Sequence, residues 1–170
     1  TRIRLFRQDL NTPFLNAHDV RIVPKTYEAY TIQNWSIKDL ELMFSYVTKV
    51  KGWADTEFRS LSSFAGFSGT NYGLILLGAK YLLEDYLKIQ FWDYYSYNFM
   101  NMIFVQVDNT WNPHKDVSIV GSLQGLYQHS VGRSLNGKFN ASMFGAQVAF
   151  NWLDAGLVLA YTIADNSYDI

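Results

Sequence analysis

The sequence contains no cysteine, so disulfides, thiolate metal ligands and thiol redox chemistry have no place in this chain. It also lacks any apolar run that approaches the roughly 18–20 residues needed for a transmembrane helix. A helical membrane span is therefore excluded. The mean hydropathy of −0.07 does not exclude membrane-spanning strands, because about half of the residues in a barrel wall are polar.

Charged residues are scarce, at 17%, and the net charge is −1, so a nucleic-acid partner is not expected. There is no Gly-x-Ser-x-Gly motif, no phosphate-binding glycine loop and no histidine–carboxylate spacing typical of a metal site. We expect His18, His114 and His129 to be surface residues of a loop, a turn and a strand end. The sequence therefore indicates no enzyme, no metal and no cofactor.

Alternating apolar and polar residues recur through most of the chain, in runs of about ten residues separated by turn residues. Such runs are typical of strands with one apolar and one polar face, and about 9–11 residues suffice for a tilted strand to cross a bilayer. Tyr, Phe and Trp together make up 17% of the residues, as expected for aromatic girdles at the two membrane interfaces. The fold class is therefore predicted to be all-β, a transmembrane antiparallel meander β-barrel, with strands at residues 1–8, 27–35, 40–51, 71–82, 86–95, 99–109, 117–129, 139–151 and 157–165.

The predicted connections tend to alternate between tight and long, as in outer-membrane barrels with short periplasmic turns and longer outer loops. We assign the turns at residues 36–39, 84–85, 112–116 and 153–156 to the periplasmic side. The first strand and the last residues suggest that the chain is a segment of a longer protein.

Two other classes give similar patterns. A soluble antiparallel barrel that binds a ligand shows the same alternation, but its outward face should carry many charges. An outer-membrane barrel enzyme should show a Ser/His/acid cluster at one rim, which the sequence does not let us assemble. The polar face here is dominated by Ser, Gln, Asn and Thr, which favours the membrane barrel and leaves both classes as alternatives.

Six basic residues are predicted to lie opposite the apolar face of their strands. In a membrane barrel that face is the lumen, because a charge facing lipid at mid-depth costs about 2–4 kcal/mol. A column of fixed cations would raise the local concentration of anions in a narrow, water-filled path. These residues are Arg2, Arg4, Lys49, Lys51, Lys80 and Lys88.

Two consecutive segments resemble the OprD family of substrate-specific outer-membrane porins. Residues 7–16 contain Thr12-Pro13, and residues 19–30 contain Arg21 followed by Pro24. The following strand, residues 40–52, and residues 78–87 are similar to the family as well. The resemblance implies an 18-stranded barrel, of which this chain would supply about half, in a single porin domain.

The resemblance also implies what the chain does and where. Residues 9–26 would fold into the lumen as a constriction loop, and the protein would lie in the outer membrane of a Gram-negative bacterium, in contact with lipid and lipopolysaccharide, as a monomer or homotrimer. It would allow passive, partly selective diffusion of small anionic or zwitterionic solutes, with no cofactor. The predicted substrate pathway comprises Arg4, Asp19, Arg21, Glu28, Lys49 and Lys88.

Overall fold

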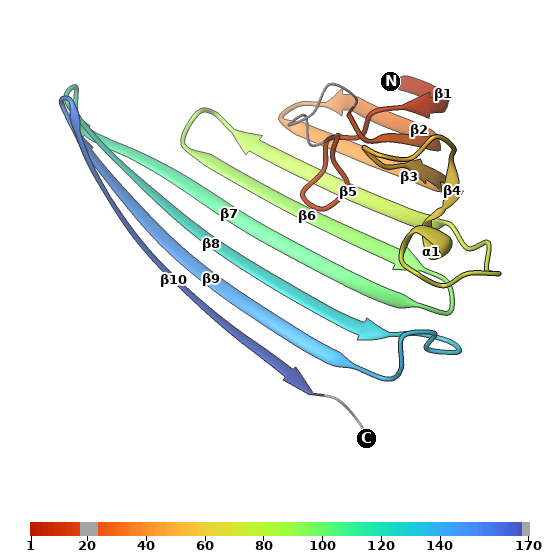
Figure 1. The fold of residues 1–170 in the computed structure, drawn as a ribbon. Coiled ribbons are helices and arrows are strands. Elements are labelled where there is room, and N and C mark those ends of the chain that lie inside the picture. Colours follow the sequence, from red (N-terminus) through yellow and green to blue (C-terminus); the bar gives the residue numbers. More distant parts are fainter. Residues whose placement is uncertain (18–23, 168–170) are drawn as a thin grey trace.

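The chain forms one antiparallel meander sheet in a computed structural model that describes residues 1–17 and 24–167. Nine strands follow one another across the sheet in the order β1-β2-β3-β5-β6-β7-β8-β9-β10, and the two-residue β4 pairs with β3 (Figure 1). The predicted all-β antiparallel meander is therefore confirmed. The strands are β1 Arg2–Gln8, β2 Thr26–Ile37, β3 Leu40–Lys51, β4 Arg59–Ser60, β5 Leu74–Leu83, β6 Leu87–Ser96, β7 Met100–His114, β8 Val117–Ser130, β9 Asn140–Trp152 and β10 Ala155–Ser167.

The two ends of the sheet differ in the length of their connections. At one end, here called the turn end, tight hairpins join β2 to β3, β5 to β6, β7 to β8 and β9 to β10. At the other end, the loop end, three connections are long, while residues 97–99 form a tight turn between β6 and β7. The predicted alternation of tight and long connections therefore holds except at this β6–β7 turn.

The long loop between β3 and β5 contains a short helix that the sequence did not predict. Helix α1 spans Leu61–Phe64, and the hydroxyl of its N-cap Ser60 accepts a hydrogen bond from the Ser63 amide at 3.2 Å. Four residues are too few to show helical periodicity, which explains why only a loop was expected. No helix in the described part of the chain is long and apolar enough to cross a membrane.

Burial alternates along the strands and distinguishes two faces of the sheet. On the inner face Val47, Leu76, Trp92 and Tyr94 are almost completely buried. Large apolar side chains on the opposite, outward face stay exposed, among them Ile32, Phe44, Leu77, Phe91 and Val105. A continuous exposed apolar face on a sheet this wide suits a lipid environment.

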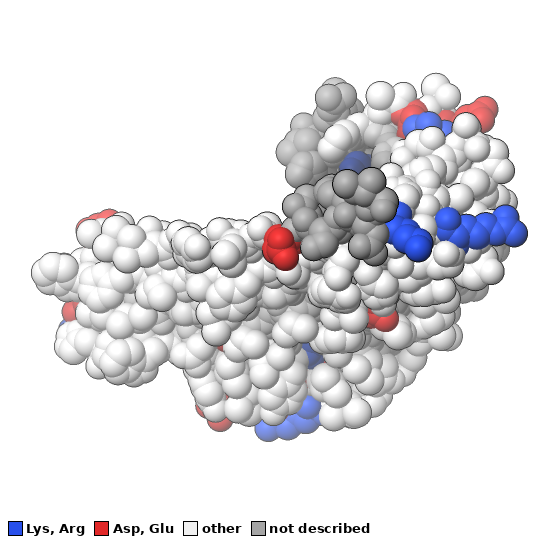
Figure 2. All heavy atoms as spheres, turned by 90° about the horizontal axis from the view of Figure 1, so that it is seen from below, with Lys and Arg blue, Asp and Glu red and all other residues white. Residues whose placement is uncertain are grey.

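The strands of the sheet are curved along their length, most clearly β7 to β10 (Figure 1). Figure 2 also shows that charged side chains occupy little of the visible surface, most of which is uncharged. The curvature, the exposed apolar face and the free edges at β1 and β10 fit a section of a barrel wall.

Candidate functional site

Polar side chains form two neighbouring rows across the inner face, which we call the inner belt. The first row follows direct strand pairing from Glu41 through Lys80, Gln90, Gln106, Gln124 and Gly145 to Thr162. The second row lies two residues nearer the turn end and contains Lys88, Asp108, Ser122 and Gln147. Because side chains two residues apart on a strand share a face, register alone brings both rows to the same side of the sheet.

The lysines of the inner belt are paired with carboxylates. Lys80 Nζ lies 3.7 Å from Glu41 Oε2, and Lys88 Nζ lies 3.9 Å from Asp108 Oδ2. All four side chains are partly exposed, and ion pairs of this kind contribute only about 0–1 kcal/mol to stability. Their main consequence is electrostatic, because the charges of Lys80 and Lys88 are each offset by a neighbouring carboxylate.

An amide relay joins these charges across β6 and β7. The Trp92 indole N–H donates to Gln90 Oε1 at 3.1 Å, Gln90 Nε2 donates to Gln106 Oε1 at 3.0 Å, and Gln106 Nε2 donates to Asp108 Oδ1 at 2.8 Å. The Lys80 ammonium lies 5.4 Å from the centroid of the Trp92 ring, within the range of a cation–π contact. The relay fixes the direction of each amide and leaves a rigid polar wall.

Arg4 extends the inner belt at the β1 edge. Its Nη2 donates to Gln33 Oε1 at 3.4 Å, and Gln33 Nε2 in turn donates to Glu41 Oε1 at 3.2 Å. Arg4 Nη1 donates to the Asp9 carbonyl at 3.2 Å, while its Nε is buried without a hydrogen-bond partner. Within residues 1–17 and 24–167 no carboxylate lies at ion-pair distance from Arg4, so its charge is not offset as those of the belt lysines are.

The structure places Lys49 and Glu28 on the other side of the sheet from the one expected. The two side chains pair at 3.3 Å, and their strand pairing is displaced by a β-bulge at Thr48, the residue left between the pairs Ala29–Val47 and Glu28–Lys49. An extra residue shifts the alternation by one position. Glu28 therefore shares the outward face of Tyr30 and Ile32, and Lys49 lies beside it, whereas Lys88 lies on the inner face as predicted. Asp19 and Arg21 fall outside the described residues.

The described part of the loop after β1 packs across the inner face. Leu10 is fully buried, and the Phe14 ring meets Tyr94 and Phe104 edge-on, with centroids 5.6 and 5.3 Å apart. The Phe14 amide donates to the Tyr94 hydroxyl at 3.4 Å. The Tyr27 hydroxyl donates to the Asn16 carbonyl at 3.0 Å. These contacts carry the loop from the β1 edge to β6 and β7, about halfway across the sheet.

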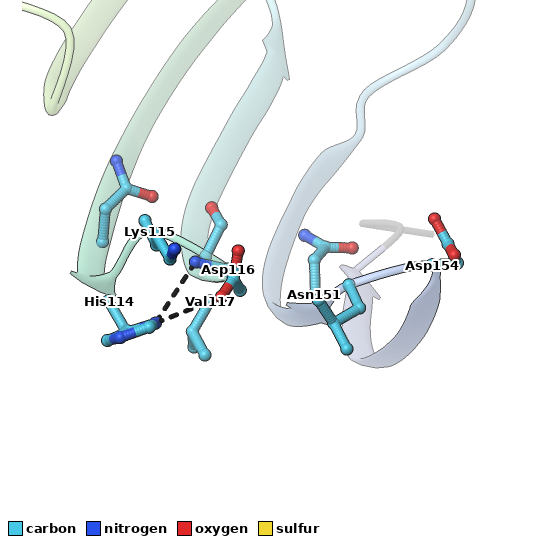
Figure 3. A pocket seen from close by; sticks show the side chains of 9 residues that line it. His114, Lys115, Asp116, Val117, Asn151 and Asp154 are labelled. Carbon is cyan, nitrogen blue, oxygen red and sulfur yellow. Dashed lines mark hydrogen bonds and ion pairs between the residues drawn. The ribbon is translucent and has the colours of Figure 1, made fainter.

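A separate, open hollow of about 710 Å³ lies at the turn end between two hairpins (Figure 3). His114 and Asp116 come from the β7–β8 hairpin, and Asn151 and Asp154 from the β9–β10 hairpin. His114 Nδ1 accepts a hydrogen bond from the Asp116 amide at 3.4 Å, which stabilises the turn. Among the described residues no three His, Cys, Asp or Glu side chains are grouped to hold a metal ion. The side chains that line the hollow therefore belong to the two hairpin turns and their adjoining strand ends.

The clustering of four glutamines in the inner belt was not predicted from the sequence. Gln90, Gln106, Gln124 and Gln147 come from four strands, and only strand register shows that they are neighbours. Within a single strand these glutamines look like ordinary polar residues of an alternating run. A sequence-based search would need a correct register for all four strands.

Residues 1–169 match the family described as outer membrane porin, OprD family. No curated protein sequence matches the chain.

Three solved porin structures illustrate the similarity of fold. OccK8 (OprE) of Pseudomonas aeruginosa has a TM-score of 0.87 at 18% identity, over 99% of this chain and 48% of that one. OpdK of Pseudomonas aeruginosa with vanillate has a TM-score of 0.84 at 14% identity, over 93% and 42%. OccK2 (OpdF) of the same organism in complex with glucuronate has a TM-score of 0.83 at 14% identity, over 95% and 44%.

The chain spans less than half of the length of these solved structures, as expected for a section of a larger barrel. The family match covers nearly the whole chain, and it agrees with the curved meander sheet and its exposed apolar face. These observations place the protein in the outer membrane. The chain belongs to the OprD family of outer membrane porins.

Proposed function

We propose that the protein containing this chain lets small carboxylate-bearing solutes diffuse passively through a lumen that the loop after β1 narrows. The observation that carries this proposal is the position of Arg4. It links the inner belt to the start of the loop, and within the described residues its charge has no carboxylate partner. A cation held at a constriction attracts anions and lowers the cost of stripping their water.

The packing of the loop supports the constriction. Phe14 and Leu10 lie over inner-face residues of the wall, and apolar side chains at an outer loop tip would instead face water. The two ion pairs of the belt leave it locally neutral, which favours moderate selectivity over strong anion preference. Two relatives hold vanillate and glucuronate, both of which carry a carboxylate, in agreement with this solute class.

The proposed pathway includes Arg4 and Lys88 on the inner face. Asp19 and Arg21 remain proposed members, because they belong to the same loop. Glu28 and Lys49 pair with each other on the outward side near the loop end, and we leave them out of the pathway.

The test is uptake of a radiolabelled small carboxylate, benzoate, into proteoliposomes that contain the protein in the form the cell makes. The uncharged benzamide serves as the reference solute. We expect R4Q to slow benzoate uptake several-fold and to leave benzamide uptake unchanged. The matched control is K38Q, because Lys38 lies 92% exposed in the β2–β3 turn, outside the inner belt. Equal slowing of both solutes by R4Q, or equal effects of R4Q and K38Q, would contradict the role of the Arg4 charge.

A further inference from the structure

The inner belt contains charged side chains up to β7 and only uncharged residues from β8 onward. Across β3 to β7 it contains two ion pairs, whereas its members on β8, β9 and β10 are all uncharged. A cavity of about 250 Å³ lies over this uncharged part. Its polar lining residues include Gln106, Ser122, Gln124, Gln147 and Thr162, and no Lys, Arg, Asp or Glu lines it.

Two of the lining amides have unused hydrogen-bonding capacity. Gln106 is engaged with Gln90 and Asp108, but Gln124 and Gln147 make no hydrogen bond within the described part of the chain. Each primary amide offers two N–H donors and an acceptor oxygen. The cavity therefore presents free donors and free acceptors on the neighbouring strands β8 and β9, where Gln124 and Gln147 are diagonal neighbours.

Gly145 makes room for this arrangement. A Cβ atom at Gly145 would lie 2.7 Å from Gln124 Nε2 and 2.9 Å from its Cγ, closer than van der Waals contact allows. The Gln124 side chain thus lies across β9 over the bare glycine, with its amide along the wall. Any larger residue at this position would force the Gln124 amide to move from its place against β9.

The chemistry of the cavity indicates which groups it suits. A carboxylate only accepts hydrogen bonds and an ammonium only donates them, whereas a hydroxyl does both, as an amide does. Adjacent hydroxyl groups can therefore pair with an amide in both directions, without a charge to offset. The neighbouring Ser122 and Thr162 hydroxyls add partners of the same kind.

We propose that Gln124 and Gln147, with Ser122 and Thr162, form a binding site for the hydroxyl groups of a monosaccharide-sized polyol that passes along the wall. The site lies on β8 to β10, remote from Arg4 on β1. It is therefore a second binding site on the solute pathway, separate from the anion-attracting site at Arg4. The proposal rests on the proposed channel function and specifies a solute class for one wall of that channel.

The experiment measures block of the ion current by added glucose in a planar bilayer, with the protein in the form the cell makes. The variant Q124M/Q147M keeps side-chain length and removes both amides. Net hydrogen bonds of about 0.5–1.5 kcal/mol each correspond to a glucose affinity at least about fivefold lower. Block of the ion current by benzoate should be the same in Q124M/Q147M as in the wild type. Gln128 is the matched control, since it lies on β8 beyond the cavity lining, and Q128M should leave glucose affinity unchanged.

A second pair of variants tests the shape of the site without removing an amide. G145A should lower glucose affinity, because its methyl group displaces the Gln124 amide. G125A adds a methyl to β8 at a position with nothing within 4 Å, and it should have no effect. Equal heat resistance of the two variants in detergent would show that neither effect comes from unfolding.

The outcomes separate this site from the channel itself. Loss of glucose block in Q124M/Q147M and G145A alone supports the site. The site would be overturned if glucose blocked Q124M/Q147M and G145A as it blocks the wild type, or if Q128M lost glucose block to the same extent. It would also be overturned if glucose did not block a conducting wild-type channel. Each of these results would leave the proposed channel function intact. A wild-type protein that does not conduct at all would overturn the proposed function, and the site with it.

Discussion

Removal of the Phe14 ring should release the constriction. Phe14 makes edge-on contacts with Tyr94 and Phe104, at 5.6 and 5.3 Å between centroids. Such contacts contribute about 0.5–1.5 kcal/mol each beyond buried area, so F14A should weaken loop docking by about 1–3 kcal/mol. Since about 1.4 kcal/mol corresponds to tenfold, the ratio of undocked to docked loop should rise roughly 5- to 150-fold.

The assay is single-channel conductance in planar bilayers. F14A should increase mean conductance and open-channel noise, because an undocked loop occupies less of the lumen. F14L keeps an apolar side chain and should show a smaller increase. The control is F67A, which removes a ring from the β3–β5 loop, where Phe67 packs edge-on against Phe99. If F14A conducts as the wild type does, the loop does not narrow the path and the reasoning from its packing fails.

Three further predictions concern the wall and the β3–β5 loop. G78A should destabilise the barrel by about 1–3 kcal/mol, because its Cβ would overlap the buried Trp92 ring; urea unfolding in detergent measures this. F91R, which puts a charge midway along β6 on the outward face, should cost about 2–4 kcal/mol in the same assay in lipid vesicles. In the β3–β5 loop, the hydrogen bond from Arg59 lowers the pKa of the Asp55 carboxyl below its ordinary value of 3.8, so protection of that loop from proteases should persist from pH 7 to about pH 4 and decline in more acidic solution.

Each of these predictions has its own control. G125A places a methyl where nothing lies within 4 Å and should unfold like the wild type. L153R changes an exposed residue of the β9–β10 turn and should not affect stability in vesicles. The pKa of Asp55 is lower in the folded loop than in the unfolded chain. The charged carboxylate therefore stabilises the loop fully at any pH above the unfolded-state pKa, and this stabilisation is lost as the pH falls through the folded-state pKa. D55N should therefore make the loop protease-sensitive at pH 7, and loop protection that is unaffected by D55N would show that the Arg59–Asp55 contact does not order it.

The antiparallel meander could be predicted from the sequence because the features that indicate it lie within short segments of the chain. Alternation within each strand and the composition of the turns are properties of short segments, and all nine predicted strands occur in the predicted order. The end of β7 was placed too early, at residue 109, because Asn112 and Pro113 look like turn residues. In the structure they continue the strand to His114, with a register irregularity between Trp111 and His114.

The candidate site was less predictable because it depends on register and bulges. Strict alternation puts Lys49 in the lumen, but the single extra residue at Thr48 reverses its side, and nothing in the local sequence marks that bulge. The pairing of Lys80 with Glu41 and of Lys88 with Asp108 likewise depends on cross-strand register. The face on which Lys80 and Lys88 lie could therefore be predicted, whereas their pairing with carboxylates could not.

The central claim is that this wall belongs to a channel in which Arg4 supplies an inner-face charge that no carboxylate of the described residues offsets. The most direct measurement is the reversal potential of the protein, in the form the cell makes, in a planar bilayer with a KCl gradient. The account predicts a moderate preference for chloride that R4Q reduces. K88Q removes the ion-pair partner of Asp108, and it should also shift the reversal potential toward cation preference. Cation preference in the wild type, or a reversal potential that R4Q does not move, would contradict the account.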